Sequence, residues 1–446
     1  MELFSMEVWA LVMFAVLMVT LFLGYPVALT LGAIALLFGI IFLEPQLFLG
    51  ALPLRIWGVM TNFTLLAVPL FVFMGIILEK SGLAEDLLET MGLLFGPLRG
   101  GLALSIVVVG SMLAATTGVV GATVVTMGII ALPSLLKNGY SPALATGIIA
   151  TTGTLGQIIP PSIVLILLGD MIGVPVGRLF LAAVIPGTLL IVLYIVYIAI
   201  KAWRDPHSAP ALASDIHKWD IKFFLAVLKS VLPALLLIIA VLGSLFFGIA
   251  TPTESAAFGA MGALLLALLH KRLNLQKLRD AMQHTTRLTS MVFLILIGAT
   301  AFGLVFRGMG GDSMVHDIFT QLPGGKWGFI FVSLLLIFIL GFFLDFLEIC
   351  FIVVPILAPI AAHFGIDLLW FAILIAVNLQ TSFLTPPFGF SLFYLNAVAP
   401  PTVRISVIYR GIVPFVILQV LGLILLVIFP QITLWLPNLV DEWHNL

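Results

Sequence analysis

Charged residues are scarce in this sequence of 446 residues. They make up 9% of the chain, while hydrophobic residues make up 62%. Soluble domains usually carry roughly 25% charged and 45–50% apolar residues. The composition therefore predicts an all-α membrane protein that crosses the bilayer several times, because apolar segments cross as helices that satisfy their own backbone hydrogen bonds.

Cysteine and ordered groups of metal ligands are also lacking. Cys350 is the only cysteine, which excludes an intrachain disulfide and a cysteine metal cluster. The seven histidines have no ligand spacing, and the basic residues are dispersed in a chain of net charge −1. We therefore expect no metal beyond sodium and no nucleic-acid partner. No basic region precedes the first apolar stretch, so we expect a retained helix and not a cleaved signal peptide.

Two Pro-Pro steps interrupt long apolar segments beside small polar residues. Pro160 and Pro161 lie within the segment at about 141–170, and Pro386 and Pro387 lie within the one at about 367–397. Proline removes helix hydrogen bonds, and the freed carbonyl groups are tolerated in a membrane only where protein or a water-filled cavity satisfies them. Two broken helices in corresponding positions are typical of a transport site.

The two steps lie 226 residues apart, and the same offset pairs Pro26 with Pro252 and Pro133 with Pro359. This spacing predicts a duplicated architecture, although helix breakers also recur between helices of similar length. The predicted units are a first repeat at 1–200, a cytoplasmic linker at 201–229 and a second repeat at 230–446.

Two apolar stretches, at about 101–136 and 327–362, each contain two short halves around a polar middle, and we interpret both as re-entrant helical hairpins. The first repeat then makes five crossings, so the second repeat is inserted upside down. With both termini on the periplasmic side, every Lys and Arg lies in the cytoplasm except Arg55, Arg178, Arg307 and Lys326. This strong bias supports the assignment.

The first hairpin tip and the first break contain many small and hydroxyl-bearing residues. Hydroxyl and unwound backbone oxygens are hard ligands, and no carboxylate accompanies them, which favours sodium. The alternative is that small residues and threonine only pack helices together in lipid. The candidate residues are Thr116, Thr117, Gly118 and Gly121 at the tip, and Thr151, Thr152, Gly153, Thr154, Gly156, Pro160, Pro161 and Ser162 at the break.

The second hairpin differs because it contains the carboxylates Asp345 and Glu348. Intramembrane carboxylates are costly, and these two, three residues apart, share one face if the segment is helical. They are candidates for a second sodium site or for a proton; alternatively, the tip reaches water. The second break adds Asn378, Gln380, Thr381, Ser382, Thr385, Pro386 and Pro387.

An anionic substrate is favoured at the half-helix N-termini that follow Pro161 and Pro387, where backbone N–H groups lack partners. The hydroxyls of Ser162 and Ser391 are further donors there. Arg307 ends a helix on the outer face. Four alternative roles are open for it: an ion pair with Asp312, contact with a soluble partner, binding of an anion, or simple extension of the side chain to the membrane interface.

Several ordered strings carry a family resemblance over nearly the whole chain. They are Gly24-Tyr-Pro26, Phe73-Met-Gly-Ile-Ile-Leu-Glu-Lys-Ser-Gly82, Phe343-Leu344-Asp345, Pro355-Ile-Leu-Ala-Pro359, Gly365-Ile-Asp367 and Thr385-Pro-Pro-Phe-Gly389. With them the chain resembles the DctM-like large permease subunit of the tripartite ATP-independent periplasmic (TRAP) transporters of the bacterial inner membrane. Many relatives carry a serine-rich first tip, where this chain has Thr116-Thr117-Gly118.

The resemblance implies an elevator-type fold with scaffold and transport domains, and sodium-driven uptake of an organic acid through the tips and breaks. It also implies two partners, a periplasmic substrate-binding protein and a small membrane subunit. The second hairpin is similar to a subgroup for 2-oxo or hydroxy monocarboxylates, with a C4-dicarboxylate as the alternative substrate.

Three other functions compete with this interpretation. A stand-alone sodium- or proton-coupled carboxylate symporter of the same architecture would need no binding protein. An intramembrane enzyme would have to use Asp345 and Glu348, which lack a His or Lys partner in their segment, so we expect no enzyme. A passive channel would need a ring of identical pore-lining groups, which the sequence does not indicate.

Overall fold

The computed structural model describes residues 5–212, 221–387 and 389–444, and these segments are built from helices. Three short segments are not α-helical: η1 (Thr64–Leu66) and η2 (Leu155–Gln157) are 3₁₀ turns and η4 (Ile349–Val353) is a π-helix. The α-helices are α1 (Met6–Phe22), α2 (Val27–Phe42), α3 (Pro45–Met60), α4 (Ala67–Lys80), α5 (Leu83–Phe95), α6 (Gly101–Thr117), α7 (Val120–Lys137), α8 (Pro142–Thr154), α9 (Ile163–Ile172), α10 (Val176–Arg204), α11 (Ile221–Phe246), α12 (Pro252–Leu269), α13 (Leu275–Gly308), α14 (Gly311–Thr320), α15 (Gly325–Leu340), α16 (Phe346–Glu348), α17 (Val354–His363), α18 (Leu368–Leu384), α19 (Phe390–Val398), α20 (Ile405–Ile428) and α21 (Gln431–His444).

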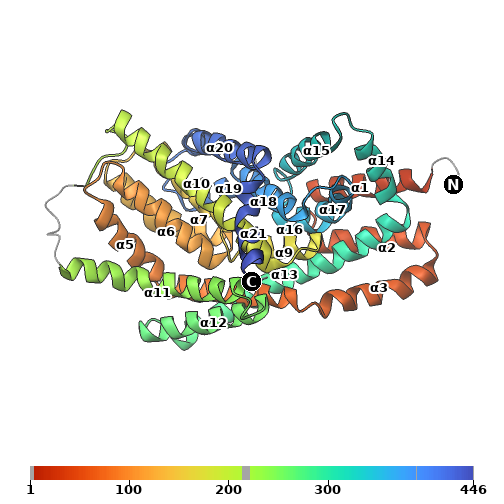
Figure 1. Ribbon diagram of the computed structural model, residues 1–446, viewed down its shortest axis with the longest axis horizontal. Helices are drawn as coiled ribbons and strands as arrows, with labels where there is room; N and C mark the ends of the chain where they lie inside the picture. The colour runs from red at the N-terminus through yellow and green to blue at the C-terminus, as the bar shows by residue number, and fades with distance from the viewer. Residues whose placement is uncertain (1–4, 213–220, 388, 445–446) are drawn as a thin grey trace.

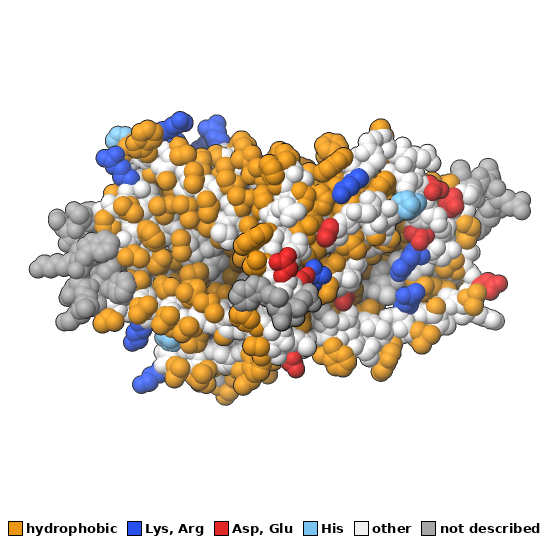
Figure 2. Space-filling model, viewed as in Figure 1, with side chains coloured by type: hydrophobic (Ala, Val, Ile, Leu, Met, Phe, Trp, Pro, Cys, Tyr) orange, Lys and Arg blue, Asp and Glu red, His pale blue; other side chains and the backbone are white. Residues whose placement is uncertain are grey.

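The helices have the length and composition of a membrane protein. Within the described residues, seven are long and apolar enough to cross a bilayer, or eight if the bent pair α3 and η1–α4 forms one span. Figure 2 shows one face of the molecule, covered largely by hydrophobic side chains with charged groups in a few places. The predicted all-α polytopic class is therefore confirmed.

Helix starts follow local sequence signals. Thr251 forms a capping box with Glu254 ahead of α12, and Pro252 occupies the first helical position. Asn274 accepts a hydrogen bond from the backbone N–H of Lys277 at the start of α13, at 2.7 Å. Such caps satisfy N–H groups that have no partner inside the helix. They fix where α12 and α13 begin.

An offset of 226 residues maps the helices of the first half onto those of the second. Helix α7 at 120–137 corresponds to the run α16–η4–α17 at 346–363, α9 corresponds to α19, and α10 corresponds to α20. Contacts repeat as well: α7 packs on α19 while α17 packs on α9, and α5 contacts α11 while α14 contacts α1. The opposite insertion of the two halves and the bounds of the predicted units stay predictions.

The two halves differ in the region of α3 and α4. In the first half, α3 and η1–α4 are separate and bent by 51°, whereas α13 is continuous over 34 residues. Pro53 and Arg55 interrupt the apolar sequence of α3, so the sequence alone does not mark it as a membrane span.

The helices form an elongated molecule with the breaks near its centre. In Figure 1, α3, α11 and α12 lie along the lower edge, α10, α20 and α15 lie along the upper edge, and α9, α16 and α18 lie near the middle. Helix α2 contacts α13, and α4 contacts both α12 and α13. Separately from these, α8 packs on α20 and α18 packs on α10.

Candidate functional site

The first hairpin turns at Gly118, between α6 and α7. Its φ of +61° lies in the left-handed region, where a side chain is strained and glycine is not. Across the turn, the hydroxyls of Thr117 and Thr123 are 2.7 Å apart, and Thr117 also donates to the carbonyl of Leu113. The tip is therefore a tight, hydroxyl-bearing turn.

The first break separates α8 from α9. Helix α8 passes into η2, the Pro160–Pro161 peptide bond is cis, and Ser162 caps α9. The Ser162 hydroxyl donates to the carbonyl of Gln157 at 2.8 Å and accepts from the N–H of Leu165 at 3.5 Å. In this conformation the hydroxyl that we expected to be a substrate donor instead holds the two sides of the break together.

The structure brings the first tip and the first break together. A Cβ added at Gly118 would lie 3.5 Å from the carbonyl oxygen of Pro161, and one at Gly156 would lie 3.2 Å from the carbonyl oxygen of Ala114. Gly121, in the first turn of α7, faces the second half, because an added Cβ would lie 3.2 Å from the ring of Tyr394 on α19. The absence of side chains at Gly118 and Gly156 thus lets the backbone of the tip pack closely against the backbone of the break.

Several threonine hydroxyls lie along the first tip and the first break. Those of Thr116, Thr152 and Thr154 donate to carbonyls of their own helices, which leaves their lone pairs available. The Thr151 hydroxyl oxygen is fully buried and has no partner within the described chain. Buried polar atoms are nearly always satisfied, so Thr151 requires a ligand, an ion or a water. Oxygen ligands without a carboxylate suit a monovalent cation.

The second hairpin contacts the second break in the same way. Gly341, which follows α15, lies so close to the Ser382 hydroxyl that a Cβ would not fit. The Asn378 side chain donates to the carbonyl of Leu334 in the hairpin at 2.7 Å. The peptide bond between Pro386 and Pro387 is cis, as in the first break.

Hydroxyl groups also hold the second break. Thr381, Ser382 and Thr385 donate to carbonyls of α18. Ser391 donates across the break to the carbonyl of Phe383 at 3.0 Å, so it too spans the break instead of offering its proton to a ligand.

Asp345 and Glu348 form a capping box, a role that we did not assign from the sequence. Asp345 accepts a hydrogen bond from the N–H of Phe346 at 2.7 Å, and Glu348 accepts one from the N–H of Asp345 at 3.1 Å. Asp345 therefore precedes α16 instead of sharing a helical face with Glu348. The spacing of an acidic cap and a glutamate three residues later was the available signal.

A buried polar group connects the two broken helices. The amide nitrogen of Gln419 on α20 donates to the Tyr194 hydroxyl on α10 at 2.9 Å and lies 3.5 Å from the Thr154 hydroxyl. Gln380 reaches the same Tyr194 hydroxyl at 3.5 Å. Sequence reasoning missed Tyr194 and Gln419; their signal is a polar side chain near the middle of a long apolar helix.

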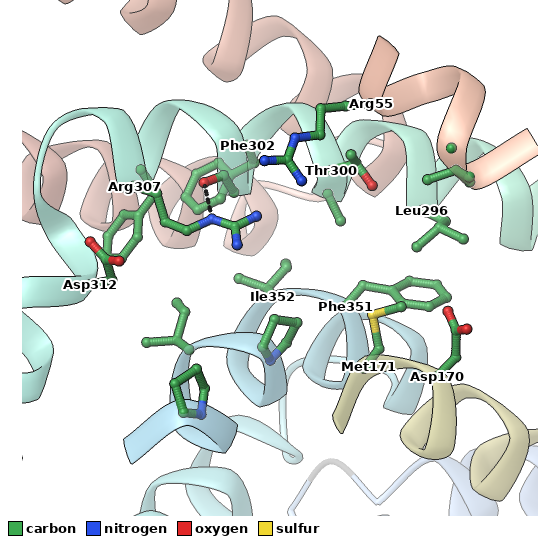
Figure 3. Close-up of a pocket in the computed structure, with 18 of the residues that line it drawn as sticks. Arg55, Asp170, Met171, Leu296, Thr300, Phe302, Arg307, Asp312, Phe351 and Ile352 are labelled. Carbon is green, nitrogen blue, oxygen red and sulfur yellow. Dashed lines mark hydrogen bonds between the residues drawn. The ribbon is translucent and has the colours of Figure 1, made fainter. Parts of the chain in front are cut away.

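A cavity of about 860 Å³ lies between α3 and α13 on one side and α9, η4 and α17 on the other (Figure 3). None of the predicted tip and break residues lines it. Arg307 does, and its Nε donates to the carbonyl of Gly303 at 3.2 Å. Within the described residues it forms no ion pair with Asp312, although both line the cavity. Arg55, Asn62 and Asp170 also line it and were not assigned a site role from the sequence.

Comparisons with known proteins give a consistent result. The family model described as "Tripartite ATP-independent periplasmic transporter, DctM component" matches residues 14–432. The chain is 31% identical over 391 residues to the C4-dicarboxylate TRAP transporter large permease protein of Pseudomonas aeruginosa, covering 87% of this chain and 89% of that protein. It is 29% identical to the sialic acid TRAP transporter large permease protein of Vibrio cholerae, covering 94% and 96%.

A solved structure shares the fold at low sequence identity. The YdaH transporter of Alcanivorax borkumensis, described as having an unusual topology, matches with a TM-score of 0.60 and 14% identity. The match covers 94% of this chain and 96% of that one. It supports the helical arrangement and carries no argument about substrate.

Proposed function

Because this chain belongs to the DctM family and is the large permease subunit of a TRAP transporter, we propose that it imports an organic acid by sodium symport. Members of this family are transporter permeases, not enzymes. Membership implies the bacterial inner membrane, a substrate-binding protein and a small membrane subunit as partners. We propose that the binding protein delivers the acid from the periplasm.

The packing of two hairpin tips on two helix breaks carries this proposal. Each contact combines unwound backbone with buried hydroxyl oxygens, as at Gly118 with Pro161 and at Gly341 with Ser382. A dehydrated sodium ion needs such oxygens to replace its water. We propose one sodium site at each contact, with the buried Thr151 hydroxyl as a ligand of the first and Asp345 near the second.

The substrate belongs to the organic acids. The similar permeases named above are described for C4-dicarboxylates and for sialic acid, both of which carry a carboxylate. The starts of α9 and α19 follow the two breaks, and helix N-termini attract anions. We propose that the carboxylate binds between these two helix starts, and that the acid is a 2-oxo or hydroxy monocarboxylate or a C4-dicarboxylate.

Transport requires the site to be exposed on each side of the membrane in turn. We propose that α6–α10 and α15–α20, which contain both hairpins and both breaks, move as a transport domain along α1–α4 and α11–α13. Gly75 of α4 meets the first tip directly, because an added Cβ would lie 2.6 Å from Thr117 Cα. This contact marks the surface at which the two domains slide.

Uptake into liposomes tests the proposed function. The purified subunit, with its small membrane subunit and an acid-loaded binding protein, should accumulate acid only with an inward sodium gradient. Replacing sodium with potassium should abolish accumulation, and omitting the binding protein should reduce it at least tenfold. Uptake that needs neither sodium nor the binding protein would overturn the proposal. Uptake that needs sodium alone would identify a stand-alone symporter.

A further inference from the structure

The cavity between α3 and α13 and the opposite helices has two different walls. Arg55 of α3 and Arg307 of α13 extend from one wall into it, as Figure 3 shows, while Met171, Phe351 and Ile352 lie on the other, beside the carboxylate of Asp170. Apart from Asp170 this second wall is apolar, and the apolar wall continues along η4 and α17 through Pro355, Ile356, Pro359 and Ile360.

Neither guanidinium group has a carboxylate partner within the described residues. The carboxylates that line the same cavity have nearby polar partners instead. Asp170 accepts from the Asn62 amide at 2.7 Å, Asp312 accepts from the N–H of Ser313 at 3.0 Å, and Asp317 lies 3.7 Å from His316. Neither arginine is therefore ion-paired in the described part of the chain, although three carboxylates line the same cavity.

A helix-end arginine that only reaches toward water does not explain this pair. Arg307 is near the end of α13, but Arg55 lies well inside α3. Space has also been left around them. A Cβ on Gly58 would meet nothing within 4 Å, and one on Gly303 would meet only Arg307 Nη2 at 3.7 Å. Guanidinium forks bind carboxylates in a bidentate manner, and the volume is in the usual range for small-ligand sites.

We propose that Arg55 and Arg307 form a capture site for an organic acid, separate from the sites at the hairpin tips. The carboxylate contacts the two guanidinium groups, and the apolar part of the acid faces η4 and α17. That the ligand is an organic acid rests on the proposed function. The arginines belong to the proposed scaffold, whereas η4 and α17 belong to the proposed transport domain, so this site holds the acid between the two domains before it reaches the hairpin tips.

Protection of a cysteine on the apolar wall tests binding without requiring transport. Cys350 is replaced by Ser, and Ile356→Cys, which is partly exposed in the cavity, is labelled with the neutral reagent N-ethylmaleimide. The experiment uses the permease with its small subunit in sodium-free potassium buffer, and the probes are pyruvate and succinate against potassium chloride of equal ionic strength. We expect at least one of the two acids to slow labelling.

Substitution of either arginine identifies the ligand groups. Arg55→Gln or Arg307→Gln should raise the half-protecting concentration about tenfold, the effect of losing hydrogen bonds to a charged group, and the double variant should show no protection. Arg178→Gln is the control, because that arginine is paired with Asp441 at 2.6 Å away from the cavity lining. It should leave protection unchanged.

Three results would overturn the capture site. The first is labelling that neither acid slows, and the second is equal protection in the double variant. In the third, the arginine variants keep protection by the acids, but the binding protein no longer stimulates uptake. That result would make Arg55 and Arg307 a docking site for the binding protein. Protection that persists when uptake proves independent of sodium would contradict only the proposed coupling.

Discussion

Thr151 offers the most direct test of a sodium ligand at the scale of one residue. Its hydroxyl oxygen is buried beside the first break and has no partner in the part of the chain that the structure describes. Thr151→Val keeps the shape and removes this oxygen. We expect the half-saturating sodium concentration for uptake to rise about tenfold, with no loss of thermal stability, because an unpaired buried hydroxyl is removed.

Thr146 on the same helix is the matched control. It is equally buried, and its hydroxyl donates to the carbonyl of Pro142 at 2.8 Å, away from the break. Thr146→Val should lower stability by about 1 kcal/mol and leave sodium dependence unchanged. If Thr151→Val behaves like Thr146→Val, the sodium ligand lies elsewhere.

Asp345 combines a structural role with a proposed ionic one, and two substitutions separate them. Asparagine caps a helix about as well as aspartate, so Asp345→Asn should retain stability while reducing sodium-driven uptake about tenfold or more. Asp345→Ala should lose uptake and also about 1 kcal/mol of stability. Initial uptake rates and thermal unfolding of the purified variants measure both effects. Full uptake by Asp345→Asn would show that the carboxylate serves only the capping box.

Single residues were the least predictable feature of this site. The sequence indicated which small and hydroxyl-bearing residues are near each break, because the Pro-Pro steps and the neighbouring threonines can be identified from the sequence alone. It did not indicate that Ser162 and Ser391 donate across the breaks, since that depends on how the chain turns after each Pro-Pro step. It also did not bring Arg55 and Arg307 to one cavity, because they lie on helices far apart in the chain.

At the scale of secondary-structure elements, Gly75 lies where α4 packs against the tip of the first hairpin. A Cβ there would lie 2.6 Å from Thr117 Cα and 2.8 Å from the Thr116 carbonyl oxygen, distances that force backbone to shift. We expect Gly75→Ala to reduce the maximal uptake rate severalfold, because the tip can no longer pack against α4. Gly32→Ala on α2, with nothing within 4 Å of its Cβ, should transport normally. Equal rates in the two variants would contradict a sliding surface at Gly75.

The joint between α10 and α20 gives a prediction for stability. Tyr194 and Tyr197 both make edge-to-face contacts with Phe415, with ring centroids 5.7 and 5.1 Å away, but only Tyr194 is hydrogen-bonded to Gln419 in this structure. Tyr194→Phe should cost about 1–3 kcal/mol by leaving buried amides unpaired, while Tyr197→Phe should cost little. Thermal unfolding of the purified variants measures this difference. A similar loss in both would show that ring packing alone holds the joint.

Some helices can be predicted from apolar runs bounded by proline and glycine, and others cannot. The segment at 101–136 contains α6 and α7, and the segment at 327–362 contains α15 followed by the run α16–η4–α17. That the two segments are re-entrant stays a prediction. Helix α3 is hard to predict from the sequence because proline and arginine lower its apolar character, although Leu54 and Trp57 are exposed apolar side chains in this fold. Here packing against α13 decides what local composition does not.

Over the whole molecule, contacts between segments far apart in the chain join segments that the Lys and Arg distribution predicts to lie on the same side of the membrane. Arg272 pairs with Asp86 at 3.0 Å, and both belong to the predicted cytoplasmic side. On the predicted outer side, Thr253 donates to the carbonyl of Phe63 at 2.8 Å, and Arg178 pairs with Asp441. Two consistent faces follow, and which of them is cytoplasmic remains a prediction from the positive-inside bias.

The inverted insertion of the two halves is the claim on which the shared site depends, because only opposed halves place both breaks at one depth. Cysteines introduced singly at Arg204, Lys271 and Lys326, with Cys350 replaced by Ser, report the side of each loop to an impermeant thiol reagent added to intact cells. We predict that only Lys326→Cys is labelled from outside, while Arg204→Cys and Lys271→Cys require permeabilised cells. Labelling of Arg204→Cys and Lys271→Cys from opposite sides would contradict the inverted arrangement.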